Sequence, residues 1–154
     1  MSTEIFEYAP APESRAIVNI KSEYGLYING KWLAPHSKKR FASINPSNEE
    51  VLAKVSLADA VDVDKAVKAA RSAYNKVWAK MPPKERAKYL FRIARLLQER
   101  AREFAVLEAL DNGKPIRETR DVDVPLSAAH FFYHAGWADK LNMQALAQIP
   151  SRMA

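Results

Sequence analysis

The sequence of 154 residues contains no cysteine, and it has only four glycines. Without cysteine, the chain has no disulfide framework, no thiolate metal ligand and no cysteine nucleophile. The glycines are too far apart for a phosphate-binding loop or a dinucleotide fingerprint, in which closely spaced glycines let backbone amides approach a phosphate. They are Gly25, Gly30, Gly113 and Gly136. We therefore expect no nucleotide-binding loop and no cofactor site within these residues.

Long apolar runs and blocks of one charge are also missing. No apolar window approaches the ~20 residues that a bilayer requires, and Met1–Glu4 does not begin a basic and then apolar leader. The net charge is +6, but lysine and arginine alternate with acidic residues. Such a pattern is typical of a solvated surface. We predict a cytoplasmic protein that binds neither membranes nor nucleic acid.

The longest periodic stretch runs from Pro82 to Pro115 and predicts one amphipathic helix of about 30 residues. Two prolines suit its first turn, and Gly113 followed by Pro115 suits its end. The apolar positions recur every three or four residues, at Leu90, Ala94, Leu97, Ala101, Phe104 and Leu107. An apolar stripe of this length needs a cover, and the rest of the chain supplies only part of it.

Two further helices are predicted. Asp59 can cap the first, whose alanine-rich apolar face consists of Val63, Ala66, Val67, Ala70, Tyr74 and Val77. Asp123 can cap the second after a charged, punctuated run, with Pro125 in the first turn. The stripe of this last helix is Leu126, Ala129, Tyr133, Trp137 and Leu141.

The head of the chain predicts a small antiparallel sheet. Asn29-Gly30 lies between β-forming residues and favours a type I′ hairpin turn, because both residues tolerate positive φ. Residues 41–57 predict two strands about a turn at Pro46–Glu49. We expect residues 1–23 to be a loose arm, with a short edge strand possible at 17–20. Residues 24–140 then form one unit, and 141–154 a divergent tail.

Histidines provide the only hint of a metal site. His130 and His134 stand four apart on a predicted helix, which is the spacing of two ligands on one face. No third ligand is indicated, so we expect no metal. Ser127 near His130 resembles a nucleophile and base, but no oriented acid accompanies the pair.

Six runs resemble the N-terminal part of the aldehyde dehydrogenase superfamily, in the family's order and with its approximate spacing. The resemblance covers about Leu26 to Lys140. The runs are YINGKW, INPSNEEVLAKV, DVDKAVKAARSAY, the pair of Trp78 and Glu85-Arg86-Ala87, LDNGKP and AGWADK. The resemblance implies an α/β fold in which three main helices and the small sheet form an incomplete part of an NAD(P)-binding domain.

The resemblance also implies a reaction. In the family a cysteine thiolate attacks an aldehyde, hydride passes to NAD(P)⁺, and a glutamate activates the water that releases the acid. None of these catalytic or cofactor-binding residues can be assigned here. The last predicted helix resembles one that lines the family's substrate tunnel, which makes Leu126 and His130 candidates for its wall. Ordinary packing in a core or interface is the alternative. From Leu141 onward the resemblance fails.

Two functions remain open at this stage. The chain is either a front portion of an NAD(P)-dependent aldehyde dehydrogenase, inactive alone, or a non-catalytic subunit that associates with a full-length relative. Uncovered apolar helix faces favour self-association or such a partner. A free-standing helical protein is a third, weaker hypothesis. The sequence does not indicate which aldehyde is the substrate or whether the cofactor is NAD or NADP. It does not indicate the oligomeric state.

Overall fold

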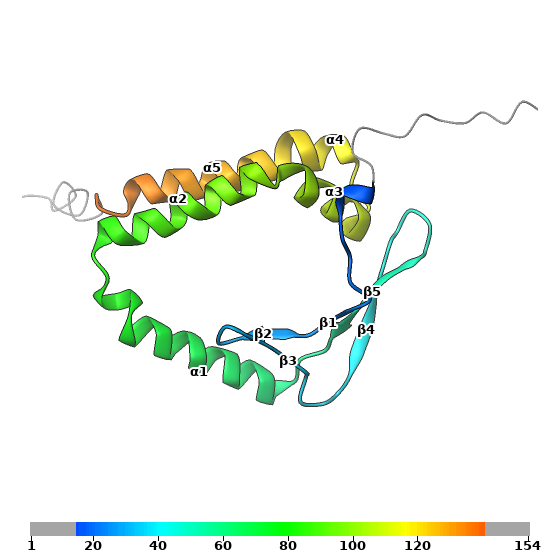
Figure 1. Cartoon of the computed structure of the whole chain (residues 1–154), viewed down its shortest axis with the longest axis horizontal. Helices are drawn as coiled ribbons and strands as arrows, with labels where there is room; N and C mark the ends of the chain where they lie inside the picture. The colour runs from blue at the N-terminus through cyan, green and yellow to red at the C-terminus, as the bar shows by residue number, and fades with distance from the viewer. Residues whose placement is uncertain (1–14, 141–154) are drawn as a thin grey trace, which may run out of the picture.

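The computed structural model describes residues 15–140, which form an open arc in Figure 1. Helices α2 and α5 lie side by side along one arm, α1 forms the other arm, and strands lie between the two. The helices are α1 (Ala60–Lys76), α2 (Pro83–Glu99), α3 (Ala101–Asn112), α4 (Ile116–Glu118) and α5 (Val124–Trp137). Short helical segments are η1 (Arg15–Ile17), η2 (Trp78–Lys80) and the π-helical turn η3 (Thr119–Asp123).

The strands form two small sheets. They are β1 (Glu23–Tyr24), β2 (Leu26–Ile28), β3 (Lys31–Leu33), β4 (Arg40–Ile44) and β5 (Val51–Ser56). The predicted hairpin is confirmed: β2 pairs antiparallel with β3, and Asn29 and Gly30 have φ values of 52° and 76°. The predicted pair about Pro46–Glu49 is confirmed as β4 and β5.

Two details of the sheet region differ from the prediction. Strand β1 pairs parallel to β5, with Glu23 opposite Lys54, so this sheet is mixed and not wholly antiparallel. A two-residue strand has no periodicity by which sequence could reveal it. The short edge strand considered at residues 17–20 is absent, because Ile17 ends η1 and residues 18–20 lie in no regular element.

The predicted long helix is divided at Arg100. This residue has φ −105° and ψ 19°, outside the helical region, and it separates α2 from α3. Its guanidinium donates to Glu103 at 2.6 and 2.8 Å and lies 5.6 Å from the centre of the Phe104 ring. The break turns α3 toward the sheet, where Phe104 and Leu107 share a cavity with residues of β5.

The buried side chains of the described residues are small. Within residues 15–140, no Leu, Ile, Phe, Tyr, Trp or Met is buried. The buried alanines and valines are Ala53, Ala94, Ala105, Val106, Val124, Ala128 and Ala135. The buried residues of α2 and α5 include Ala94, Ala128 and Ala135, whose small side chains let the two helices approach closely. Beside them, the rings of Phe91 and Phe132 have their centres 6.0 Å apart. Because large apolar residues usually fill a core, the core formed by these residues is incomplete.

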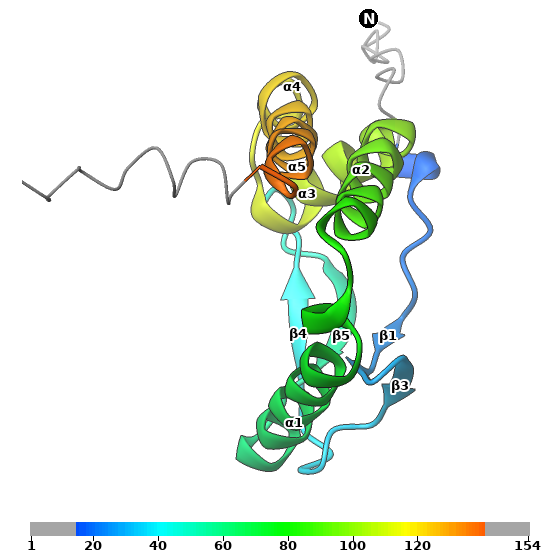
Figure 2. The ribbon, with the colours of Figure 1, turned by 90° about the vertical axis from the view of Figure 1, so that its left-hand side faces the viewer.

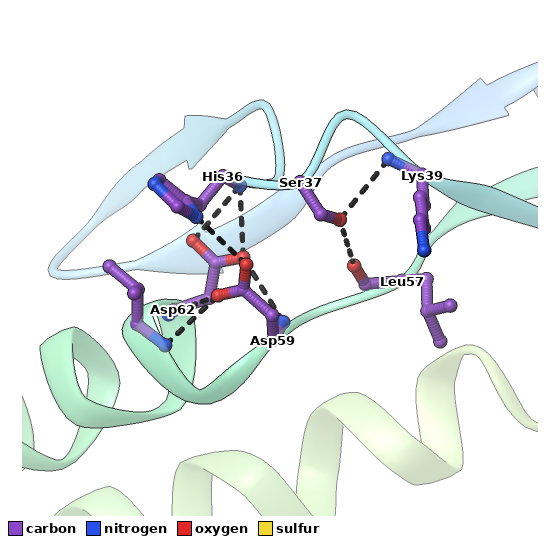
Figure 3. Close-up of polar contacts among 7 residues, drawn as sticks. His36, Ser37, Lys39, Leu57, Asp59 and Asp62 are labelled. Carbon is purple, nitrogen blue, oxygen red and sulfur yellow. Dashed lines mark hydrogen bonds and ion pairs between the residues drawn. The ribbon is translucent and has the colours of Figure 1, made fainter.

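A polar cluster fixes the start of α1, as Figure 3 shows. Asp59 caps the helix as predicted, and its carboxylate accepts from the amides of Val61 and Asp62 at 2.9 and 3.2 Å. Asp62 is 4% exposed and accepts from the amide of Asp59 in return. The loop between β3 and β4 is tied to the same cap by His36. The sheet and α1 therefore share one set of hydrogen bonds.

Candidate functional site

The charged, punctuated segment that leads into α5 is helical. Helix α4, the π-helical turn η3 and α5 follow one another from Ile116 to Trp137. Figure 2 looks nearly along these helices and shows α5 beside α2. Asp123 has helical backbone angles (φ −66°, ψ −51°) and makes no capping hydrogen bond, so its predicted role as the cap is wrong. Its carboxylate instead accepts a hydrogen bond from the ammonium of Lys114. The pKa of Lys114 is raised because of this hydrogen bond.

The π-helical turn is anchored by Thr119, which is completely buried. Its hydroxyl lies 2.9 Å from the carbonyl oxygen of Ala105 in α3 and 3.1 Å from that of Ile116. The amide of Val124 donates to the carbonyl of Thr119, five residues earlier, which is the hydrogen bond that defines a π turn. Sequence reasoning missed this feature, because neither periodicity nor a known motif marks it.

One face of the segment points away from the α2–α5 contact, and we call it the outward face of α5. It consists of Val122, Leu126, His130 and Tyr133, all of them exposed. Leu126 is 51% exposed and Tyr133 61%. Ala128 and Ala135 lie buried on the opposite side. The structure thus places the predicted pair, Leu126 and His130, on one face and outside the core of the described residues.

The other polar residues singled out on this helix form no reactive arrangement. No hydrogen bond joins Ser127 to His130 among the interactions of residues 15–140. The ring of His134 packs edge-on against Tyr133 at 5.3 Å. Across the described part of the chain, no three His, Asp or Glu side chains lie together in an arrangement that could hold a metal ion.

A cavity of about 510 Å³ lies between the mixed sheet and helices α2, α3 and α5. Its volume falls within the ~300–1,000 Å³ of ligand pockets. Ser43 donates a hydrogen bond to Asp111 at its edge, and Glu108 adds a second carboxylate. Leu126 and His130 do not line it. The lining residues are Ile20, Tyr24, Ser43, Leu52, Ala53, Val55, Leu97, Phe104, Leu107, Glu108, Asp111, Val124 and Ser127.

The outward face of α5 and the cavity beside the mixed sheet are both suited to binding. The outward face of α5 offers apolar side chains and one imidazole, which can line an apolar passage. The cavity is mostly apolar with an acidic edge, so it can receive apolar side chains or a ligand with donor groups. No helix among residues 15–140 is long and apolar enough to cross a membrane.

The chain is similar to proteins of one family. The model of the "Aldehyde dehydrogenase family" matches residues 32–154, a range that includes the tail 141–154. An aldehyde dehydrogenase from Alternaria alternata is 43% identical over 126 residues, which are 82% of this chain and 25% of that protein. The mitochondrial aldehyde dehydrogenase family 2 member B4 of Arabidopsis thaliana is 42% identical over 76% of this chain and 22% of its own length.

Solved structures give the same result. The NAD⁺ complex of an aldehyde dehydrogenase from Bacillus cereus superposes with a TM-score of 0.77 at 40% identity. The superposition covers 86% of this chain and 27% of that one. The chain therefore spans about a quarter of the length of the relatives and structures that it matches.

Proposed function

Because the chain belongs to the aldehyde dehydrogenase family, we propose that it forms the front quarter of an NAD(P)-dependent enzyme that oxidises an aldehyde to a carboxylic acid. The match to the family over residues 32–154 carries this proposal. Likeness to a structure solved with NAD⁺ supports a nicotinamide cofactor for the complete enzyme. The cofactor, in this proposal, is bound by parts of the enzyme other than these residues.

The chain by itself is inactive in this proposal. Its 154 residues contain no cysteine, and in the family a cysteine thiolate attacks the aldehyde. The incomplete core supports the same conclusion, since each large apolar side chain left in water forgoes about 1.5–3 kcal/mol. Leu107 and Phe104, which are 39% and 37% exposed beside the cavity, are such side chains. In the complete enzyme, the remainder of the domain packs over them.

The outward face of α5 is the part of this chain that meets the aldehyde. Leu126 and His130 lie on it four positions apart, and both are exposed. In the complete enzyme they form part of the tunnel wall, where the apolar side chain contacts the substrate's body. Substrate choice among aldehydes would then respond to the size of residue 126.

A chimera tests the proposal. The matching quarter of the Bacillus cereus enzyme is replaced by this chain, and NADH formation from NAD⁺ and a simple aldehyde is measured. We expect NADH from the chimera and none above the protein-free background from the chain alone. A second chimera with Leu126→Ala should change KM among aldehydes of different size, while Lys68→Ala on α1 serves as a matched surface control. A folded but inactive chimera, or an active isolated chain, would contradict the proposal.

A second function, a non-catalytic subunit, is favoured by the apolar face of α1. Val63, Val67, Tyr74 and Val77 on this face are 49–59% exposed. A contiguous apolar surface of this kind is typical of an interface or of aggregation. Capture of a purified full-length relative by the tagged chain, with retention of the relative's activity, would support this function. Self-association alone would support neither function. The cytoplasmic location accompanies both proposals, and cell fractionation tests it.

A further inference from the structure

Thr119 and Leu126 are seven positions apart, yet their environments are opposite. Residues seven apart lie on the same face of a regular α-helix. Thr119 is 0% exposed, whereas Leu126 is 51% exposed. A change of helical register between the two residues accounts for this difference in exposure.

The π-helical turn supplies that change. In η3 the amide of Val124 bonds to the carbonyl of Thr119 and not to that of a residue four earlier. One extra residue in a turn rotates every later side chain by about 100° relative to a continuous α-helix, because each residue of an α-helix turns 100°. Without it, Leu126 would share the buried direction of Thr119.

Two contacts hold the turn. The hydroxyl of Thr119 is within bonding distance of the carbonyl of Ala105, which belongs to α3, so the turn is fixed to a second helix. The ion pair of Lys114 and Asp123 spans the turn from the outside, joining a residue two positions before α4 with the last residue of η3. Only the first contact is buried, so it is the less exposed to water and salt.

We propose that Thr119 is a positioning residue: it holds the π-helical turn and thereby rotates Leu126 and His130 outward from the α2–α5 contact. In the complete enzyme this rotation decides which side chains the helix presents to the aldehyde. The role of the rotation toward the aldehyde rests on the proposed function, whereas the role of Thr119 in holding the turn concerns the chain alone.

Because the chain has no cysteine, single introduced thiols report the rotation. Leu126→Cys reports the outward face, and Ala128→Cys, at a position that is 2% exposed, reports the buried side. The rate of alkylation by N-ethylmaleimide is measured for both in the full chain. We expect the thiol at 126 to react about tenfold faster or more, since a buried thiol reacts only when the structure opens locally.

The effect of Thr119 is read from the ratio of the two rates. Thr119→Val keeps the shape and removes the hydroxyl, and it should lower the ratio at least threefold. Thr119→Ser keeps the hydroxyl and should preserve the ratio. An unchanged ratio in Thr119→Val would overturn the proposal, as would equal effects of Val and Ser. Rates at both positions equal to those in urea would also overturn it, because Thr119 would then hold the whole fold and not one turn.

The chimera separates this inference from the proposed function. There, Thr119→Val should raise KM for the aldehyde several-fold with a smaller change in kcat and no change in KM for NAD⁺. A parallel fall of kcat for all aldehydes with KM constant would contradict a positioning role. A chimera without any NADH formation would refute the proposed function, while the alkylation ratio would still decide the role of Thr119.

Discussion

The imidazole Nδ1 of His36 lies 2.8 Å from the carboxylate of Asp59, the residue that caps α1. The backbone amide of the same histidine donates to both carboxylate oxygens of Asp62, at 3.0 and 3.2 Å. Ser37 adds a hydrogen bond to the carbonyl of Leu57, so the loop after β3 is joined both to the start of α1 and to the segment that precedes it (Figure 3). The position of α1 relative to the strands depends on this junction.

Asp62→Ala should therefore destabilise the chain by about 1–3 kcal/mol, because it leaves the amides of His36 and Asp59 without their acceptor. The midpoint of urea unfolding, followed by circular dichroism, measures the change. Asp64→Ala is the matched control: its carboxylate is exposed and pairs only with Lys68. We expect it to cost less than about 0.5 kcal/mol. Equal shifts in the two variants would refute the role of Asp62.

The same junction predicts a pH dependence. The hydrogen bond from His36 lowers the pKa of Asp59, amides of Asp62 and Val61 lower it further, and desolvation opposes them. A carboxyl group whose folded pKa is depressed stabilises the fold above its ordinary pKa of about 3.9 and loses that contribution as the pH falls through the folded pKa. The urea concentration at the midpoint of unfolding should therefore decrease as the pH falls below about 4. This decrease should be smaller in His36→Ala. Parallel pH profiles of the two chains would contradict this.

Gly113 ends α3 with φ +77°, in the left-handed region. A Cβ at this position would lie 3.0 Å from Cγ of Pro46. Gly113→Ala should destabilise the chain by about 1–2 kcal/mol or more, from the backbone conformation and this contact together. Gly136→Ala, in α5 with open space around the added Cβ, should instead stabilise by about 0.5–1 kcal/mol. Thermal unfolding measures both changes: the Tm should fall in Gly113→Ala and rise in Gly136→Ala.

The exposed face of α1 predicts concentration-dependent association. Val67 is 59% exposed at the centre of this face, so Val67→Glu should reduce both the sedimentation-derived mass at high concentration and the binding of a hydrophobic dye. Asn75→Asp makes the same change of charge on the same helix without removing an apolar side chain. If both variants reduce association equally, net charge and not the apolar face controls it.

Local turn and cap chemistry allowed the hairpin and the start of α1 to be predicted. Asn29-Gly30 specifies its turn by backbone preference, and Asp59 specifies its cap by a short acceptor side chain. The break at Arg100 could not be predicted, because the apolar period continues through it from Leu97 to Phe104. Beyond this break, α3 is linked to β4 through the hydrogen bond from Ser43 to Asp111, and such a tertiary interaction leaves no local pattern in the sequence.

Less of the candidate site could be predicted from the sequence. Leu126 and His130 were identified through family resemblance, and nothing in their spacing indicates that they point outward. That direction depends on the π-helical turn, and the turn depends on a hydroxyl of Thr119 reaching a carbonyl of α3. A contact between residues 14 apart that overrides helical periodicity leaves no regular pattern in the sequence.

The small buried residues at the contact of α2 and α5 also bear on the order of folding. Helices that meet through alanines can associate early, since few bulky side chains must find their rotamers. Strands β4 and β5 are joined by a short turn and close rapidly. Both units can form while a ribosome is still adding later residues, which arrive at about 5–20 per second. During that interval the uncovered faces of α1 and α2 are open to chaperones and to neighbouring nascent chains.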